Sequence, residues 1–128
     1  VNSREYYQRC VKTLLQVGNI QDKTFAKNTG MILELIPDKN PYEKNLKKIG
    51  FQVLFENKPV NNALVLVWQK ENGKTSVKKL RANEDGKVTF ELNPSGRWMI
   101  SSVKMIPFEN KSEADWQSFW GSYTFGWL

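Results

Sequence analysis

The chain has 128 residues, a length that fits one domain and leaves too little for a second core. Hydrophobic residues make up 40% of it and aromatic residues 12%, so a buried core is available and intrinsic disorder is disfavoured. The longest apolar run, residues 63–68, is far shorter than the roughly 20 residues of a membrane-spanning helix. No transmembrane segment is therefore expected in this chain.

The net charge of +6 is spread along the chain, and its tightest cluster is Lys78, Lys79 and Arg81. On a strand, Lys79 and Arg81 would share one face while Lys78 would lie on the other. Nucleic-acid binding is disfavoured, because proteins that bind single strands place aromatic side chains in a basic groove. Trp68 and Trp98 instead lie in apolar strand patterns and are expected in the core.

A helix is predicted over residues 3–17, with Ser3 as its cap and Gly18 at its end. We expect Cys10 to be a buried small hydrophobe rather than a nucleophile, because a catalytic thiolate needs a nearby histidine and the chain has none. The helix should pack on the rest of the domain through Tyr7, Cys10, Val11 and Leu14. Its apolar residues recur at spacings of three and four: Tyr6, Tyr7, Cys10, Val11, Leu14 and Leu15.

After a loop over residues 20–30, the pattern predicts strands separated by turn residues roughly every ten positions. Asn72-Gly73 and Asp85-Gly86 are both typical of β-hairpin turns. The expected strands cover residues 31–36, 51–56, 63–69, 75–80, 88–92, 97–106 and 123–128. This spacing predicts an all-β, immunoglobulin-like (prealbumin-like) antiparallel β-sandwich.

In domain terms, we expect residues 1–19 to form the N-terminal helix and residues 20–128 to form the sandwich on which it packs. The strand alternation also assigns a core. Its expected members are Leu33, Leu35, Val53, Phe55, Val65, Val67, Val88, Phe90, Trp98 and Ile100.

The segment over residues 112–119 is predicted to form a helical turn capped by Ser112. Trp116 and Trp120 are four apart and would share a face of that turn. That face either packs on the domain, which is the favoured interpretation, or lies open to a partner. Packing predicts that changing both residues to alanine unfolds the domain. If the face is open, Trp116, Trp120 and Asp115 form a candidate partner-binding surface.

Catalytic and metal-binding residue sets are not apparent, and we expect no enzyme activity, metal site or cofactor. Without histidine, neither a Ser-His-Asp nor a Cys-His arrangement can form. A transition-metal site usually needs histidine or several cysteines. The carboxylate pairs Glu84/Asp85 and Glu113/Asp115 lack calcium-loop spacing and are interpreted as turn and surface residues.

A set of short motifs, in this order, resembles an uncharacterised bacterial family of exported proteins. Some members of that family are periplasmic partners of nickel and cobalt uptake systems. The motifs are Glu5-Tyr6-Tyr7 with Lys12 and Gly18, Leu33-Glu34-Leu35-Ile36-Pro37 with Asn40-Pro41, Val53-Leu54-Phe55 with Lys58-Pro59-Val60, Ala63 and Val65, Asp85-Gly86-Lys87-Val88-Thr89-Phe90, Gly96-Arg97-Trp98, Ala114-Asp115-Trp116, Phe119-Trp120, and Tyr123-Thr124-Phe125.

The resemblance implies an exported origin, a signal peptide and a further β-rich region before the matched part, and a periplasmic or cell-surface location. It implies no established activity. Family members often carry a histidine in the strand after the Gly-Trp pair, where this chain has Lys104. Because a protonated lysine is a poor metal ligand, this departure argues against nickel or cobalt binding by the chain itself.

The expected function is an extracytoplasmic binding or accessory domain, associated with nickel or cobalt uptake. Its partner would be another protein domain or a component of a membrane transporter. The alternative is a structural or adhesive module that docks or spaces other domains and has no small-molecule ligand. A neighbouring permease gene or a measurable metal affinity would favour the first function, and additional flanking domains would favour the second.

Overall fold

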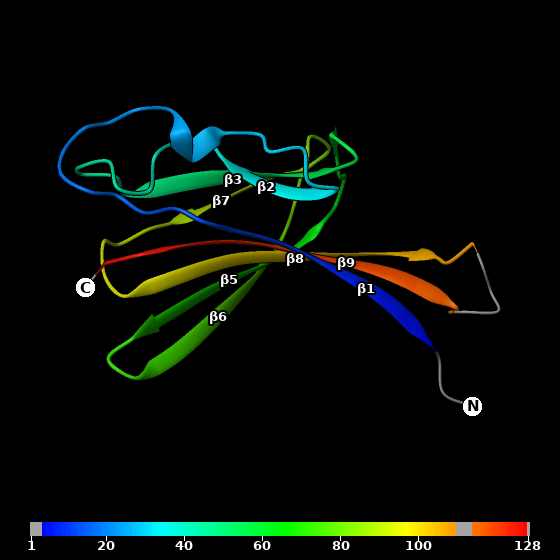
Figure 1. Cartoon of the computed structure of the whole chain (residues 1–128). Helices are drawn as coiled ribbons and strands as arrows, with labels where there is room; N and C mark the ends of the chain where they lie inside the picture. Colours follow the sequence, from blue (N-terminus) through cyan, green and yellow to red (C-terminus); the bar gives the residue numbers. More distant parts are fainter. Residues whose placement is uncertain (1–3, 110–113, 128) are drawn as a thin grey trace.

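The computed structural model describes residues 4–109 and 114–127, which form two β-sheets in a sandwich-like arrangement (Figure 1). One sheet has five strands in the order β1-β9-β8-β5-β6; the other contains β2, β3 and β4 in that order, with β7 also paired to β3. The strands are β1 (Glu5–Thr13), β2 (Leu33–Pro37), β3 (Lys48–Phe55), β4 (Lys58–Pro59), β5 (Leu64–Glu71), β6 (Lys74–Arg81), β7 (Lys87–Glu91), β8 (Arg97–Pro107) and β9 (Trp116–Gly126).

The predicted N-terminal helix is wrong, because this segment forms strand β1 at one edge of the five-stranded sheet. β1 runs parallel to β9, and Cys10 lies opposite Gly121 in the register. The apolar residues occur as adjacent pairs, Tyr6-Tyr7 and Cys10-Val11, and such pairs are compatible with both the helical period of 3.6 residues and the strand period of two. On a helix they widen one stripe, whereas on a strand each pair places one residue on either face. Pairing with β9 along the whole of β1 therefore outweighs the helical pattern.

The only helical structure among residues 4–109 and 114–127 is a single 3-10 turn, η1 (Thr24–Ala26). Within the same residues there is no helix with the length and apolar character needed to cross a membrane. The predicted helical turn near the C-terminus is also wrong where it can be compared, because Trp116 begins β9. Its proposed cap, Ser112, lies outside the described residues.

One of the two predicted hairpin turns joins neighbouring strands of one sheet, whereas the other connects strands of different sheets. Asn72 and Gly73 both have positive φ and connect β5 to its antiparallel neighbour β6, as the sequence predicts. Asp85-Gly86 instead lies in the loop that leads from β6 into β7 of the opposite sheet. Gly86 has a φ of +72°, and a Cβ there would lie 2.7 Å from the carbonyl oxygen of Val53. The turn therefore needs glycine to approach β3 closely.

The core lies between the two sheets and is centred on aromatic rings. The ring of Phe125 stacks on those of Phe51 and Trp98, with centroids 6.4 and 6.3 Å apart. Phe90 stacks on Trp98 at 6.1 Å. Of the ten predicted core residues, nine are buried, and Phe55 is half-buried against the cluster. The alternation in β2, β3, β5, β7 and β8 therefore identified the inner faces correctly.

Candidate functional site

The side of the five-stranded sheet that faces away from the other sheet, here called the outer face, carries large apolar side chains with water contact. Six of them lie on the neighbouring strands β1, β9 and β8 and form what we call the outer patch. Strand register brings them together, because Trp120 lies opposite both Arg9 and Val103, and Ser118 lies opposite both Tyr7 and Met105. The patch consists of Tyr7, Val11, Val103, Met105, Trp116 and Trp120, all of them exposed.

Trp116 and Trp120 both keep a large exposed fraction, whereas the favoured sequence interpretation expects their shared face to be packed on the domain. Trp116 is 42% exposed and Trp120 is 47% exposed. They still share a face, because a spacing of four is even and therefore returns to the same side of a strand. Ser118, between them, is fully buried, and its Oγ accepts a hydrogen bond of 3.1 Å from the indole Nε1–H of Trp120. This bond restrains the Trp120 ring against its own strand.

Asp115 immediately precedes β9 and links the start of that strand to the residue before β1. Its Oδ2 accepts a hydrogen bond of 3.0 Å from the backbone N–H of Arg4, and its Oδ1 lies 3.4 Å from the Arg4 guanidinium. Its carbonyl oxygen accepts from the backbone N–H of Phe108 at 3.2 Å. The predicted surface residue therefore positions the strand that bears Trp116, and its carboxylate is engaged within the chain.

The outer face is positively charged around its apolar centre. Arg9 extends over the ring of Tyr7, with its guanidinium carbon 5.9 Å from the ring centroid. The register also places Lys70, Lys79, Arg81 and Arg97 on this face, against the single acid Glu5. The prediction that Lys79 and Arg81 share a face apart from Lys78 is confirmed, because Lys79 lies opposite Leu66 and Arg81 opposite Leu64.

Sequence reasoning identified the two tryptophans of the outer patch and missed the other four members. Val103 and Met105 alternate with Ser102 and Lys104 in β8, so their position on one face was readable from the period. Their exposure was not, because a continuous apolar strand is equally compatible with burial on both faces. Trp68 was expected in the core, but it is half-buried on the outer face, where its Nε1–H donates to Ser101 Oγ at 3.1 Å.

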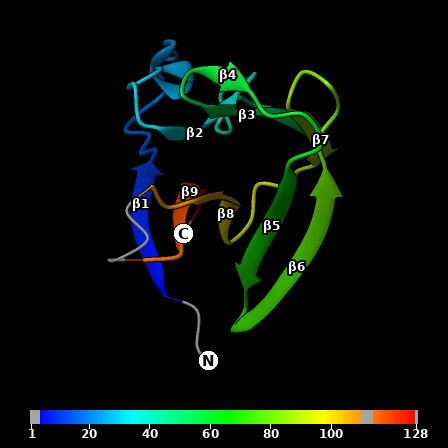
Figure 2. The ribbon, with the colours of Figure 1, turned by 90° about the vertical axis from the view of Figure 1, so that its right-hand side faces the viewer.

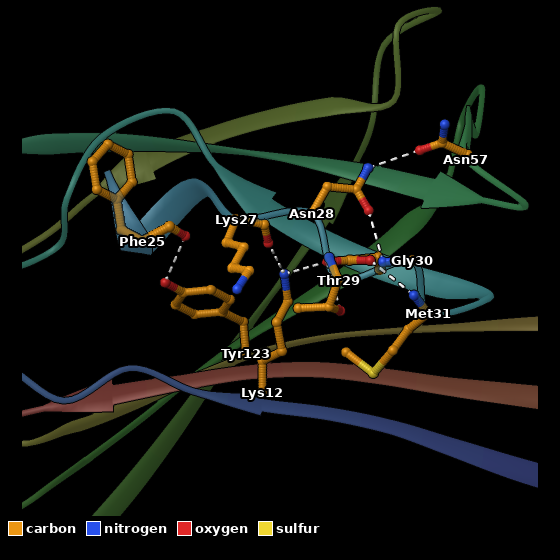
Figure 3. Close-up of polar contacts among 10 residues, drawn as sticks. Lys12, Phe25, Lys27, Asn28, Thr29, Gly30, Met31, Asn57 and Tyr123 are labelled. Carbon is orange, nitrogen blue, oxygen red and sulfur yellow. Dashed lines mark hydrogen bonds and ion pairs between the residues drawn. The ribbon is translucent and has the colours of Figure 1, made fainter. Parts of the chain in front are cut away.

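A second cluster of polar groups, which includes Lys12, Thr29 and Met31, lies at the β1 edge of the sandwich (Figure 3). These three residues all donate to the carboxylate of Glu34. Glu34 is 2% exposed, and its Oε2 lies 2.6 Å from the ammonium nitrogen of Lys12. The same oxygen accepts from the backbone N–H and the hydroxyl of Thr29, while Oε1 accepts from the N–H of Met31. Lys12 also donates to the carbonyl oxygen of Lys27 at 3.1 Å.

Glu34 accepts hydrogen bonds from Lys12 of β1 and from Thr29 and Met31 near β2, so this cluster joins the two sheets rather than presenting a site. Burial raises the pKa of the Glu34 carboxyl, but the hydrogen bonds from Lys12 and Thr29 outweigh it and hold the pKa below its usual value. Nearby, burial raises the pKa of Tyr123. Its hydroxyl donates to the carbonyl oxygen of Phe25 at 2.9 Å, which adds a second bridge (Figure 3).

Residues of metal-binding type do not converge in the described part of the chain. No group of three or more cysteine, aspartate or glutamate side chains there could hold a metal ion. Cys10 is buried in the core. Lys104, the position at which the resemblance leads one to expect histidine, places its ammonium group 5.9 Å from the centroid of the Phe55 ring.

Comparison with known proteins identifies a family. The family model described as a domain of unknown function, DUF4198, matches residues 2–105. The matched range takes in Tyr7, Val11, Val103 and Met105 of the outer patch and ends before β9. Neither a curated protein nor a solved structure matches the chain.

Proposed function

The chain belongs to the DUF4198 family, a domain of unknown function, and we propose that it is an extracytoplasmic binding or accessory domain that docks another protein. One observation carries the proposal, namely that the outer patch exposes two tryptophans beside four other large apolar side chains. Contiguous apolar surface of this kind marks interaction sites in soluble proteins. Aromatic side chains are also enriched at the centres of protein interfaces.

The charge around the outer patch supports a partner different from the chain itself. Among the residues that the structure describes, the strand register places five cationic side chains and one acid on the outer face, so two copies packed face to face would bring like charges together. The fitting partner has an apolar centre that accepts Trp116 and Trp120 and a rim that carries carboxylates. We propose such a surface on another exported protein, or on the extracytoplasmic part of a membrane transporter.

The proposal extends to the periplasmic or cell-surface location and to a role beside nickel or cobalt uptake. In that role the chain would act by protein contact, because its described residues bring no metal ligands together. Isothermal titration with nickel and cobalt salts tests this part. We expect no heat of binding, and a stoichiometric metal affinity of the chain itself would contradict it.

We also propose that the sandwich is of immunoglobulin-like type. In a variable-type immunoglobulin sandwich, one sheet contains strands G, F and C in that order, with strand C′ added beside C. The order β9-β8-β5-β6 would correspond to these four strands. The opposite sheet of such a sandwich begins with strands A, B and E, and these would correspond to β2, β3 and β7. Experimental coordinates in which these pairings differ would remove the support for this assignment.

The docking proposal is tested with the double variant Trp116→Thr/Trp120→Thr, because threonine suits a strand and removes the apolar surface. The immobilised wild-type chain is exposed to an envelope extract of the organism that makes it. We expect a retained protein that free wild-type chain displaces and the free double variant does not. Leu64→Thr/Val77→Thr is the matched control, since it removes exposed apolar residues at the other end of the same face.

The oligomeric state is measured in parallel by sedimentation. A monomer is expected, and a wild-type dimer that the Trp116→Thr/Trp120→Thr variant dissociates would replace the proposed partner with a second copy. Displacement by both double variants alike would place the contact elsewhere. If the retained protein instead proves to be a domain of the same polypeptide as this chain, the structural alternative replaces the accessory role. In that alternative the sandwich is a module that docks neighbouring domains.

A further inference from the structure

Residues of β5, β6 and β8 in one sheet and of β3 and β7 in the other line a cleft of about 720 Å³. β6 and β7 lie on the side of the sandwich opposite β1 (Figure 2). The base of the cleft is apolar and is formed by side chains that belong to the core, namely Val67, Phe90, Leu92 and Trp98. This volume is within the range of sites that bind ligands. The cleft is separate from the outer patch, because its lining residues on β5 and β8 lie on the inner side of their strands.

Both strands that flank the cleft have an unpaired edge. Among the described residues, β6 pairs only with β5, and β7 pairs only with β3. All residues of β6 are exposed except Leu80, which is half-buried. An eight-residue strand in this position presents a row of backbone N–H and C=O groups that can pair with a further strand.

The charge at this edge selects the kind of strand that can pair with it. The rim of the cleft carries Lys47, Lys48 and Lys78, against the single acid Glu91. β6 itself carries three lysines and one arginine and has no acidic residue. Lysines on an edge strand oppose pairing with a copy of the same strand. The same positive charges favour a strand that carries carboxylates, so they exclude a second copy and admit an acidic partner.

We propose that β6 and the cleft beside it form a second binding site, which takes an extended acidic segment of another protein by strand addition. The segment's backbone pairs with the free edge of β6, and alternate side chains turn into the cleft. Apolar side chains there reach the base at Phe90 and Trp98, and carboxylates meet the rim lysines. Matching the eight residues of β6 needs a segment of about 26 Å, at roughly 3.3 Å per residue.

The test titrates three synthetic eight-residue peptides with blocked termini into the whole chain by calorimetry. In the first peptide, threonine occupies every second position, and glutamate and phenylalanine alternate at the others. The second has lysine in place of glutamate, and the third has the first sequence with alternate backbone nitrogens methylated. We expect the first peptide to bind and the other two to bind at least about tenfold more weakly. The second peptide is repelled by the rim lysines, and the third cannot form the backbone hydrogen bonds to β6.

Neighbouring lysines on β6 provide a matched pair of variants. Lys78 lines the cleft, whereas Lys79 lies on the outer face. Lys78→Glu should weaken binding of the acidic peptide about tenfold, and Lys79→Glu should change it less than about twofold. Lys47→Glu is a second rim variant, outside β6, and should resemble Lys78→Glu. Far-UV circular dichroism checks that each variant retains its strands.

Amide hydrogen exchange locates the pairing. The acidic peptide should slow exchange at every second amide of β6, because alternate groups of an edge strand point away from its neighbour. It should leave the amides of β1, at the opposite edge of the same sheet, unchanged. Equal affinity for the acidic and basic peptides, no binding of the acidic peptide, an equal loss in Lys78→Glu and Lys79→Glu, or protection at β1 instead of β6 would each overturn the proposal.

Discussion

The inner and outer faces of the five-stranded sheet both carry aromatic residues, but only the inner face is covered by the other sheet. On β9, Phe119, Tyr123 and Phe125 are directed inward and are almost completely buried, while Trp116 and Trp120 on the outer side remain about half exposed. Stability should therefore depend on the inner face and binding on the outer one, although both are built from alternate residues of the same strands.

The largest expected effect is on the inner face, at Phe125. Phe125→Ala should lower the free energy of unfolding by about 3–5 kcal/mol, because the ring is buried against Phe51 and Trp98 and its loss leaves a cavity. Urea unfolding measures the change. Thr124→Ala, the next residue on the outer side, is the control and should cost less than about 1 kcal/mol. Similar losses in both variants would remove the distinction between the faces.

The second-largest loss of stability is expected when the Lys12–Glu34 ion pair is broken. Glu34→Gln should lower the free energy of unfolding by about 3 kcal/mol, because it leaves the Lys12 ammonium without its charged partner at a nearly buried position. Lys12→Met combined with Glu34→Gln should recover part of the loss, since it removes the unpaired charge. A double variant that is less stable than the sum of the single changes would contradict this account of the pair.

Acid should weaken the same joint between the sheets. The folded-state pKa of Glu34 lies below its ordinary value of 4.5, so folding favours the ionised carboxylate. Its contribution to stability is fully present above pH 4.5 and is lost as the pH falls through the lowered folded-state value. The urea midpoint of the wild type should therefore fall more steeply below pH 4.5 than that of Glu34→Gln. Parallel curves for the two proteins would show that Glu34 does not contribute.

The smallest expected effect is on the outer face. Trp116→Thr/Trp120→Thr should change the free energy of unfolding by no more than about 1 kcal/mol, because both rings keep substantial water contact and threonine is favoured in strands. Thermal unfolding of the two proteins measures it. The sequence pattern alone predicts the opposite, an unfolded double variant. A loss as large as that of Phe125→Ala would mean that the tryptophans support the fold.

β7 and β6 are examples of strands that the sequence predicts correctly, because a period of two or a hairpin turn conflicts with a helix there. Val88 and Phe90 alternate with polar residues in β7, and Asn72-Gly73 fixes the hairpin before β6. β1 failed because adjacent apolar pairs such as Cys10-Val11 fit both a helix and a strand, and its partner β9 lies at the other end of the chain. Only the tertiary pairing decides between the two.

The candidate site was predicted in part, for a related reason. The shared face of Trp116 and Trp120 follows from their spacing whether the segment is a helix or a strand, so that prediction survives the wrong secondary structure. Their exposure depends on whether another layer covers the sheet, which local sequence does not encode. Glu34 was also missed as a buried acid, because its partner Lys12 lies 22 positions away on a strand that had been predicted as a helix.

Site-specific photo-crosslinking at Tyr6 and Tyr7 tests the role of the outer face most directly. The two tyrosines are adjacent and similarly exposed, at 54% and 59%, but Tyr7 lies on the outer face and Tyr6 stacks on Phe108 on the inner side. A photoreactive phenylalanine analogue replaces each in turn, in cells that make the protein. We predict a discrete protein adduct from position 7 that disappears with Trp116→Thr/Trp120→Thr, and none from position 6. Equal adducts from both positions, or none from position 7, would contradict a docking role for this face.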